Sequence, residues 1–345
     1  MTLLALTTGI VKIMNAPIRL ELPTEFEVGA VNAWLFLEPE PILVDSGVPT
    51  EASWAALTAG LTAHNLTPAD LQRVIITHPH VDHFGQARRL TETGPAQVWI
   101  ADLGVDWLLY PQAKWQERID YYRDVFLPQV GLPPEMQTLV LGFFQHMQAT
   151  SVPVAAERLT TFRVGDELQM GGLAWQVLHM PGHASEMTCF YQPETRQFFS
   201  ADMLLPRTPT PVVERPSDGK TRAPSLPIYM ESLARVEALE IEVVYPGHGR
   251  AFGQHRELIR RQRQRIRQRM EEAYQLVAEG KHYIMEIVNT LYANRPLEAR
   301  FAGMWMLLGY LDLLQVEGRV DYTLKDGLLY YFVTAVDGGA SQDKQ

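Results

Sequence analysis

The stretch "VIITHPHVDHFG", residues 74–85, places three histidines and one aspartate within six positions, one residue after three β-branched apolar residues. Such an apolar run predicts a buried strand over residues 73–77, followed at once by a polar loop. Imidazole and carboxylate groups are the ligands that Zn²⁺ takes in catalytic sites, where one position stays open for water. The stretch therefore predicts a metal-binding loop at the end of a buried strand.

The spacing within this loop suits two neighbouring ions. His78 and His80 stand two residues apart, which puts their side chains on the same side of an extended backbone. Asp82 and His83 follow at the expected start of the next helix, from which they can reach a second ion. One loop can thus supply two adjacent metal sites.

Three further candidate ligands follow apolar strands elsewhere in the chain. His183 lies in "MPGHAS", Asp202 in "FSADMLLP" and His248 in "VYPGHGR". We assign these seven residues to two ions bridged by Asp202: His78, His80 and His183 on the first ion, and Asp82, His83 and His248 on the second. His179, four residues before His183, is expected to support the ligands rather than to bind metal.

Composition limits the class of protein. With 345 residues, 46% of them hydrophobic and 20% charged, the chain suits one large soluble domain with an appendage, or two domains. A net charge of −10 argues against bulk electrostatic capture of nucleic acid or an anionic membrane. Cys189 is the single cysteine, so no intramolecular disulfide can form. No run of 18 apolar residues occurs, and we expect a cytoplasmic protein without a membrane span.

Strands alternate with helices along most of residues 1–255, which predicts a layered α/β fold for a catalytic domain. Residues 103–150 break this rhythm with a helical, aromatic-rich insert. The insert is interpreted either as a lid that forms an apolar pocket over the metals or as a helical pair packed on its own core. Its aromatic residues are Trp107, Tyr110, Trp115, Tyr121, Tyr122, Phe126, Phe143 and Phe144.

Composition changes again after His255. A long amphipathic helix is followed by two shorter helices and by a hairpin that turns at Asp326–Gly327, a preferred two-residue turn pair. Residues 256–336 are therefore predicted to form a mostly helical, winged-helix-like domain. Residues 337–345 are expected to be a disordered tail.

The H-x-H-x-D-H motif, the later P-G-H, the isolated aspartate and the final P-G-H-G resemble the metallo-β-lactamase superfamily over about residues 15–250. The resemblance implies an αββα sandwich with a two-metal site along one edge. It also implies that Asp45, in "LVDSG", supports the histidine loop rather than binding metal.

Branches of this superfamily resemble the chain to different degrees. True zinc β-lactamases lack a bridging aspartate such as Asp202, and the flavodiiron branch has an acidic residue in place of His80. The pattern is closer to glyoxalase II, lactonases and the β-lactamase-like protein 2 group. The last group also carries a winged-helix-like module after its P-G-H-G turn.

These features predict a binuclear hydrolase that uses a metal-bound hydroxide on a small ester, thioester or lactone. Asp202 would set the distance between the ions, and Asp82 would orient the nucleophile or carry a proton to the leaving group. Zn²⁺ is the expected metal, with Mn²⁺ or Fe²⁺ as alternatives. A homodimer is compatible with the sequence.

The rival function is a metal-dependent phosphodiesterase or endoribonuclease. It rests on seven arginines in the first half of the long helix: Arg256, Arg260, Arg261, Arg263, Arg265, Arg267 and Arg269. They would form either a ridge that contacts phosphates or the solvated face of an amphipathic helix with local salt bridges. A β-lactamase and a non-enzymatic winged-helix regulator rank below both.

Overall fold

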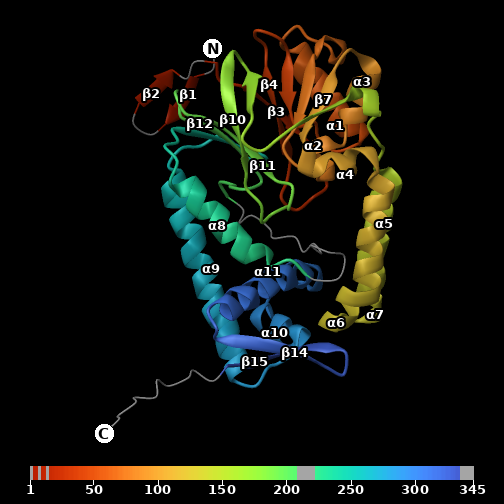
Figure 1. Cartoon of the computed structure of the whole chain (residues 1–345), viewed down its shortest axis with the longest axis vertical. Helices are drawn as coiled ribbons and strands as arrows, with labels where there is room; N and C mark the ends of the chain where they lie inside the picture. Colours follow the sequence, from red (N-terminus) through yellow and green to blue (C-terminus); the bar gives the residue numbers. More distant parts are fainter. Residues whose placement is uncertain (1–2, 7–8, 13–14, 208–221, 335–345) are drawn as a thin grey trace.

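The computed structural model describes residues 3–6, 9–12, 15–207 and 222–334, so the predicted tail lies outside the described residues. Two β-sheets pack face to face (Figure 1). The six-stranded sheet has the order β3 (Ile18–Leu22), β4 (Val31–Phe36), β5 (Ile42–Val44), β6 (Arg73–Ile76), β7 (Gln97–Ala101) and β8 (Leu159–Phe162). The five-stranded sheet has the order β13 (Val243–Pro246), β12 (Gln197–Ala201), β11 (Thr188–Gln192), β10 (Leu173–His179) and β9 (Glu167–Met170). A separate hairpin pairs β1 (Leu3–Leu6) with β2 (Gly9–Lys12).

Strand β4 shows why these sequences form buried sheets. All six of its residues are buried. Trp34 and Phe36 point into the core between the sheets, whereas Ala33 and Leu35 belong to the cluster beneath the helices. Because strand side chains alternate between faces, a strand covered on both sides must be apolar almost throughout.

Helices cover the outer faces of both sheets and complete the expected αββα sandwich. On the six-stranded sheet, α1 (Glu51–Thr62) packs against β3 and α3 (Ala87–Thr93) packs against β7. Thr50 begins α1 by accepting a hydrogen bond from the backbone N–H of Ser53. On the five-stranded side lies α8 (Ser225–Glu237) (Figure 1).

The insert between β7 and β8 is helical, as predicted. It comprises α4 (Val105–Leu109), α5 (Pro111–Tyr121), a π-helical turn η3 (Tyr122–Phe126), α6 (Leu127–Val130) and α7 (Pro134–Thr150), with α5 packed against α7. Of the eight aromatic residues singled out in the sequence, only Tyr110 and Phe143 have largely exposed side chains. Most of the aromatic content therefore packs within the insert and against its neighbours.

The C-terminal elements follow in the predicted order. They are α9 (His255–Ala278), α10 (Ile284–Leu291), α11 (Leu297–Val316) and the hairpin β14 (Val320–Lys325) and β15 (Leu328–Val333). Asp326 and Gly327 turn the hairpin with φ angles of +53° and +79°. The winged-helix assignment itself stays a prediction.

The insert and the C-terminal elements meet at the lower end of the molecule (Figure 1). Phe126 stacks on Trp305 of α11, with ring centroids 4.9 Å apart and an interplanar angle of 8°, and α6 contacts β15. In the part of the chain that the structure describes, no helix is long and apolar enough to cross a membrane.

Candidate metal centre

The candidate ligands gather at one edge of the sandwich because four strands end there. The parallel neighbours β5 and β6 lead into Asp45 and His78, and the parallel neighbours β12 and β13 lead into Asp202 and His248. Parallel strands bring their carboxyl ends to the same edge of a sheet, where α/β proteins commonly bind ligands. The topology thus joins residues that are far apart in the sequence.

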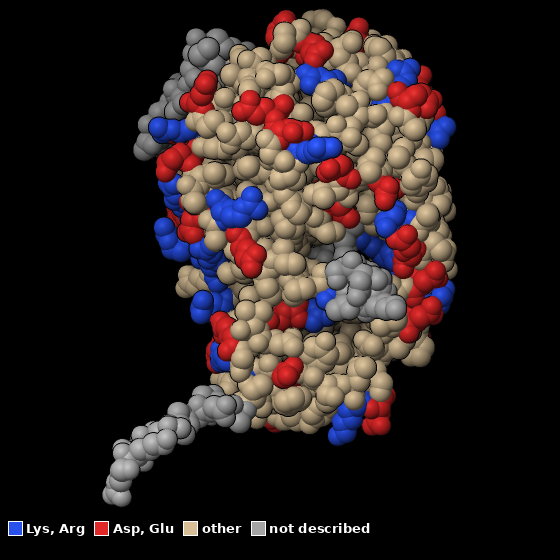
Figure 2. Space-filling view, in the orientation of Figure 1, with Lys and Arg blue, Asp and Glu red and all other residues tan. Residues whose placement is uncertain are grey.

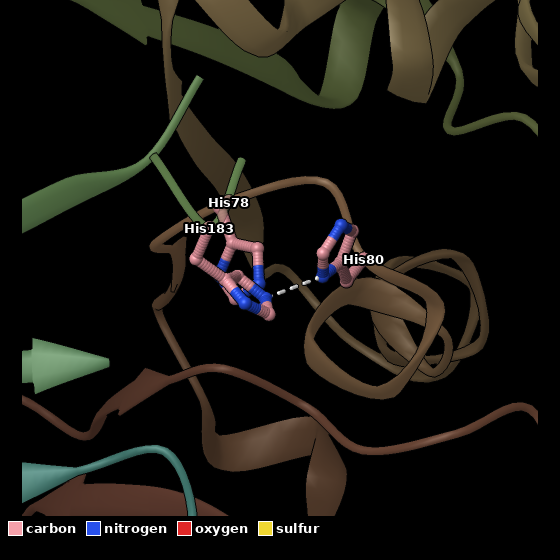
Figure 3. Close-up of side chains that lie close together, drawn as sticks. All are labelled: His78, His80 and His183. Carbon is pink, nitrogen blue, oxygen red and sulfur yellow. Dashed lines mark hydrogen bonds between the residues drawn. The ribbon is translucent and has the colours of Figure 1, made fainter. Parts of the chain in front are cut away.

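The first group of donors consists of His78, His80 and His183, whose ligand atoms all lie within 4.8 Å of one another. Their rings converge in Figure 3, with His183 on the turn between β10 and β11 and the other two on the loop after β6. The Nε2 atom of His183 lies 2.9 Å from Nδ1 of His80. This is the trio that the sequence assigned to one ion.

The second group consists of Asp82, His83 and His248. Asp82 and His83 lie on the short helix α2 (Val81–Phe84), and both are buried. Nε2 of His248 is 3.4 Å from Oδ2 of Asp82, and Nε2 of His83 is 3.9 Å from the same oxygen. This is the trio assigned to the other ion.

Asp202 stands between the two groups. Its Oδ1 lies 3.5 Å from Nε2 of His83, and its Oδ2 lies 3.6 Å from Nε2 of His183 and 3.5 Å from Nε2 of His248. One carboxylate therefore faces histidines of both groups. Such a position suits a ligand shared by two ions.

The histidine rings are oriented by hydrogen bonds on their far sides. Oδ2 of Asp45 lies 2.8 Å from Nδ1 of His83, and the same carboxylate accepts hydrogen bonds from the backbone N–H and the hydroxyl of Thr77. Nδ1 of His248 lies 2.9 Å from the carbonyl oxygen of Ala30. Contacts of this kind select the ring tautomer and leave Nε2 available as a donor to a metal.

Asn32 is part of the site that the sequence analysis missed. Its side-chain amide donates to the carbonyl oxygens of Pro246 and Gly249, at 2.8 and 2.7 Å, and its backbone N–H donates to the carbonyl of Gly247. Asn32 thereby holds the turn that carries His248. A polar residue within the otherwise apolar run "VNAWLF" was the signal, since a buried amide needs partners.

His179, expected to support the ligands, lies at the end of β10 with Nε2 2.7 Å from the carbonyl oxygen of Ser185. Both residues flank the turn that carries His183. This contact ties the two ends of that turn together.

Two observations test whether metal ions suit this site. Among the residues that the structure describes, buried Nε2 of His83, Nε2 of His248 and Oδ1 of Asp202 have no hydrogen-bond partner. A Cβ atom on Gly247 would lie 2.1 Å from Oδ1 of Asp202, so the position beside the donors must remain without a side chain. Buried polar atoms rarely remain unsatisfied without a functional reason. Converging imidazole and carboxylate donors of this kind fit divalent metal ions.

Charges inside the group reinforce this conclusion. Burial lowers the pKa of His248, but the carboxylates of Asp202 and Asp82 outweigh it and raise that pKa to about 10. Burial raises the pKa of Asp202, yet His248 and His83 hold it well below its usual range. Without an ion, protonated histidines and ionised carboxylates therefore balance one another, as bound cations would balance the carboxylates.

Comparisons with known proteins agree with this geometry. The family model described as the metallo-β-lactamase superfamily matches residues 26–248. The probable metallo-hydrolase YqjP of Bacillus subtilis is 26% identical, covering 91% of this chain and 97% of that protein. A β-lactamase-like protein 2 homolog of Caenorhabditis elegans is 22% identical, covering 87% and 83%. An atrochrysone carboxyl ACP thioesterase of Aspergillus fumigatus is 22% identical, covering 90% and 84%.

Among solved structures, a metallo-β-lactamase family protein of Thermus thermophilus has a TM-score of 0.77 at 24% identity, covering 94% of this chain and all of that one. A β-lactamase domain protein of Burkholderia ambifaria has the same TM-score at 25% identity, covering 95% and 97%. Fold, donor groups and family match agree. The chain belongs to the metallo-β-lactamase superfamily and is a metal-dependent hydrolase.

Proposed function

We propose that this protein is a binuclear hydrolase of small esters, thioesters or lactones. His78, His80 and His183 would hold one ion, Asp82, His83 and His248 the other, and Asp202 would bridge them. The observation that carries the proposal is the place of Asp202, whose two oxygens lie within 3.6 Å of histidines from both groups. The nitrogen-rich donor set favours Zn²⁺ over Mg²⁺ or Ca²⁺.

Two bound ions would lower the pKa of a water toward neutrality and polarise the carbonyl of the substrate. The residues of the chain act around that chemistry. Asp202 fixes the spacing of the donors, while Asp45 and Ala30 hold the imidazoles of His83 and His248 in one tautomer. We assign Asp82 to orienting the nucleophile or to carrying a proton to the leaving group, because its side chain, at 11% exposure, is the most exposed of the second group.

The space beside the donors supports a small substrate. A cavity of about 200 Å³ opens next to His248, the one candidate donor among the described residues of its lining, which also includes the charged Arg19, Glu21 and Arg207 and the apolar Val28, Leu205 and Pro206. Ligand pockets for larger organic molecules start at roughly 300 Å³. An acyl group of a few carbons fits this volume. The similarity to a fungal protein named as an ACP thioesterase also supports hydrolysis of an acyl substrate.

A substrate screen of the zinc-loaded protein tests the proposal. We expect turnover of p-nitrophenyl esters, acyl thioesters and lactones, with little dependence on salt. The Asp202→Ala variant should bind fewer than two ions and lose turnover by orders of magnitude while staying folded. Two ions and full activity in that variant would contradict the bridging role.

A phosphodiesterase is the second candidate, and α9 argues against it. Four of its arginines pair with carboxylates: Arg256 with Glu240, Arg261 with Glu257, Arg263 with Glu237 and Arg269 with Glu272. Basic and acidic side chains are interspersed over this helix in the space-filling view (Figure 2). Pairing of this kind leaves fewer guanidinium groups to contact a phosphate backbone.

The remaining exposed arginines of α9 provide the test. Arg260, Arg265 and Arg267 form no ion pair with any residue in the described ranges. Their combined change to Gln should leave acyl hydrolysis within about two-fold, because exposed charges of this kind contribute little. A phosphodiesterase would instead lose nucleic-acid affinity, with its salt slope falling by about one unit per contact. Tight RNA binding with that response would overturn the acyl-hydrolase proposal.

A further inference from the structure

Helix α8 lies against two loops that carry metal donors. The hydroxyl of Ser232 donates to the carbonyl oxygen of Pro181 at 2.7 Å. The hydroxyl of Tyr229 lies 3.1 Å from the carbonyl oxygen of Met203. Pro181 is two residues before His183, and Met203 directly follows Asp202. Residues three apart on a helix share a face, so one face of α8 contacts both loops.

The backbone of α8 also limits the His183 turn directly. Gly182 has a φ of +132°, and a Cβ atom there would lie 2.5 Å from both Cα and Cβ of Tyr229. The turn and the helix are thus in contact with no room for a side chain between them. Any displacement of Tyr229 must move Gly182 and, with it, the adjacent His183.

The Tyr229 hydroxyl is held in place from α9. It lies 3.1 Å from the side-chain oxygen assigned to Gln262, as well as 3.1 Å from the Met203 carbonyl. A hydroxyl has one hydrogen to donate. When that hydrogen goes to Met203, the Gln262 amide satisfies the pair by turning its NH₂ group toward the phenol oxygen.

We propose that Tyr229 is a positioning residue of the metal centre. Its hydroxyl fixes the Met203 carbonyl next to Asp202, and its backbone fixes the turn of His183. Gln262 holds the hydroxyl in place. Tyr229 and Gln262 are buried, at 2% and 9% exposure, so solvent does not replace these contacts. The inference rests on the proposed function, because it takes Asp202 and His183 as metal ligands. It implies that α8 and α9 together control the positions of His183 and of the Asp202 carboxylate.

Tyr229→Phe tests this role, because it keeps the ring and removes the hydroxyl. Tyr191→Phe is the matched control: Tyr191 is also buried, and its hydroxyl donates to a backbone carbonyl, that of Glu240, at 3.0 Å. Zinc dissociation constants are measured for each variant by competition with a chromophoric chelator, alongside the thermal midpoint of the metal-free protein. The metal-free midpoint should fall in both variants, and somewhat more in Tyr229→Phe, since each loses a hydroxyl bound to a backbone carbonyl and that of Tyr229 is the more deeply buried.

The zinc affinities should separate the two variants. We expect Tyr229→Phe to weaken the more weakly bound zinc by about ten-fold or more, as changes to groups that orient ligands do, and Tyr191→Phe to change it by less than about two-fold. Wild-type zinc affinity in Tyr229→Phe, or an equal loss in both variants, overturns the proposal.

Two further outcomes are also decisive. If Tyr229→Phe does not fold, Gln262→Leu carries the test, with weaker zinc binding expected and unchanged binding contradicting the proposal. If the wild-type protein binds a single zinc, the binuclear function fails. The ratio of the zinc affinities of Tyr229→Phe and Tyr191→Phe for that one ion still tests whether Tyr229 positions its ligands.

Discussion

Gly247 stands between Asp202 and His83 in the turn that follows β13. A Cβ atom at this position would lie 2.1 Å from Oδ1 of Asp202 and 2.9 Å from Cε1 of His83. Neither group can retreat freely, because Asp45 holds His83 and the residue after Asp202 is held by Tyr229. The proposed metal centre thus depends on a missing side chain as much as on its seven candidate donors.

The Gly247→Ala variant is expected to stay folded and to lose zinc affinity by about ten- to hundred-fold, because the added methyl group displaces the Asp202 carboxylate. Chelator competition measures this loss. Gly142→Ala is the control, since a Cβ there meets nothing within 4 Å on helix α7. Unaltered zinc binding by Gly247→Ala would show that the donors tolerate displacement.

The candidate donors could be proposed from the sequence, since they stand in short motifs directly after apolar strands, and the structure brings them close together. Of the residues that hold them, Asp45 and His179 were expected from the sequence, but others were not. Tyr229 belongs to an unremarkable segment, and although Asn32 interrupts an apolar run, the partners of both residues, the carbonyls of Pro246 and Met203, lie far away in the chain. Backbone carbonyls have no sequence signature, so only the fold reveals which buried side chains contact them.

At the scale of elements, periodicity predicted most strands and helices because local patterns encode them. The docking of the insert on the C-terminal elements was not predicted. It depends on Phe126, which packs among Tyr121, Tyr122 and Trp305. Aromatic residues on an amphipathic helix show that a partner surface exists, but they do not identify it. The stacking on α11 favours packing over a lid for this part of the insert.

Replacing Phe126 by Ala should cost about 3–5 kcal/mol of unfolding free energy, as large-to-small changes of buried aromatic residues do. Zinc content should not change, because the insert contributes no donor to either group. Hydrogen exchange should become faster in α6 and β15. Phe143→Ala, at a half-exposed position, should stay within about 0.5 kcal/mol of wild type. A loss of zinc in Phe126→Ala would instead tie the insert to the metal centre.

At the scale of the whole molecule, the metal centre links stability to pH. In the metal-free protein the pKa of His248 is raised to about 10 from its usual 6.5. Its stabilising contribution is therefore complete below about pH 6.5 and is lost as pH rises through about 10. The pKa of Asp202 is lowered, so its contribution is lost only as pH falls through that lowered value.

Chelator-treated protein should accordingly show a thermal midpoint that falls between about pH 6.5 and about pH 10. The thermal midpoint of zinc-loaded protein should not fall over this range, because zinc binds the neutral imidazoles and its binding strengthens as protons leave. Thermal unfolding across this range measures both. In the metal-free state His248→Asn should flatten the slope, and a slope equal to that of wild type would assign the effect to other groups.

The parallel pairing of β12 with β13 has a consequence for biosynthesis. Asp202 and His248 become neighbours only when β13 has joined the sheet, and α8 must first cross between the two strands. A nascent chain that ends before β13 offers the trio of His78, His80 and His183 but lacks the partner that completes the second trio. The ribosome must therefore release most of the chain before the proposed second trio is complete. On the proposed ligand assignment, binding of the second ion would require that β13 has joined the sheet, so the metal content would distinguish fully assembled molecules from incomplete ones.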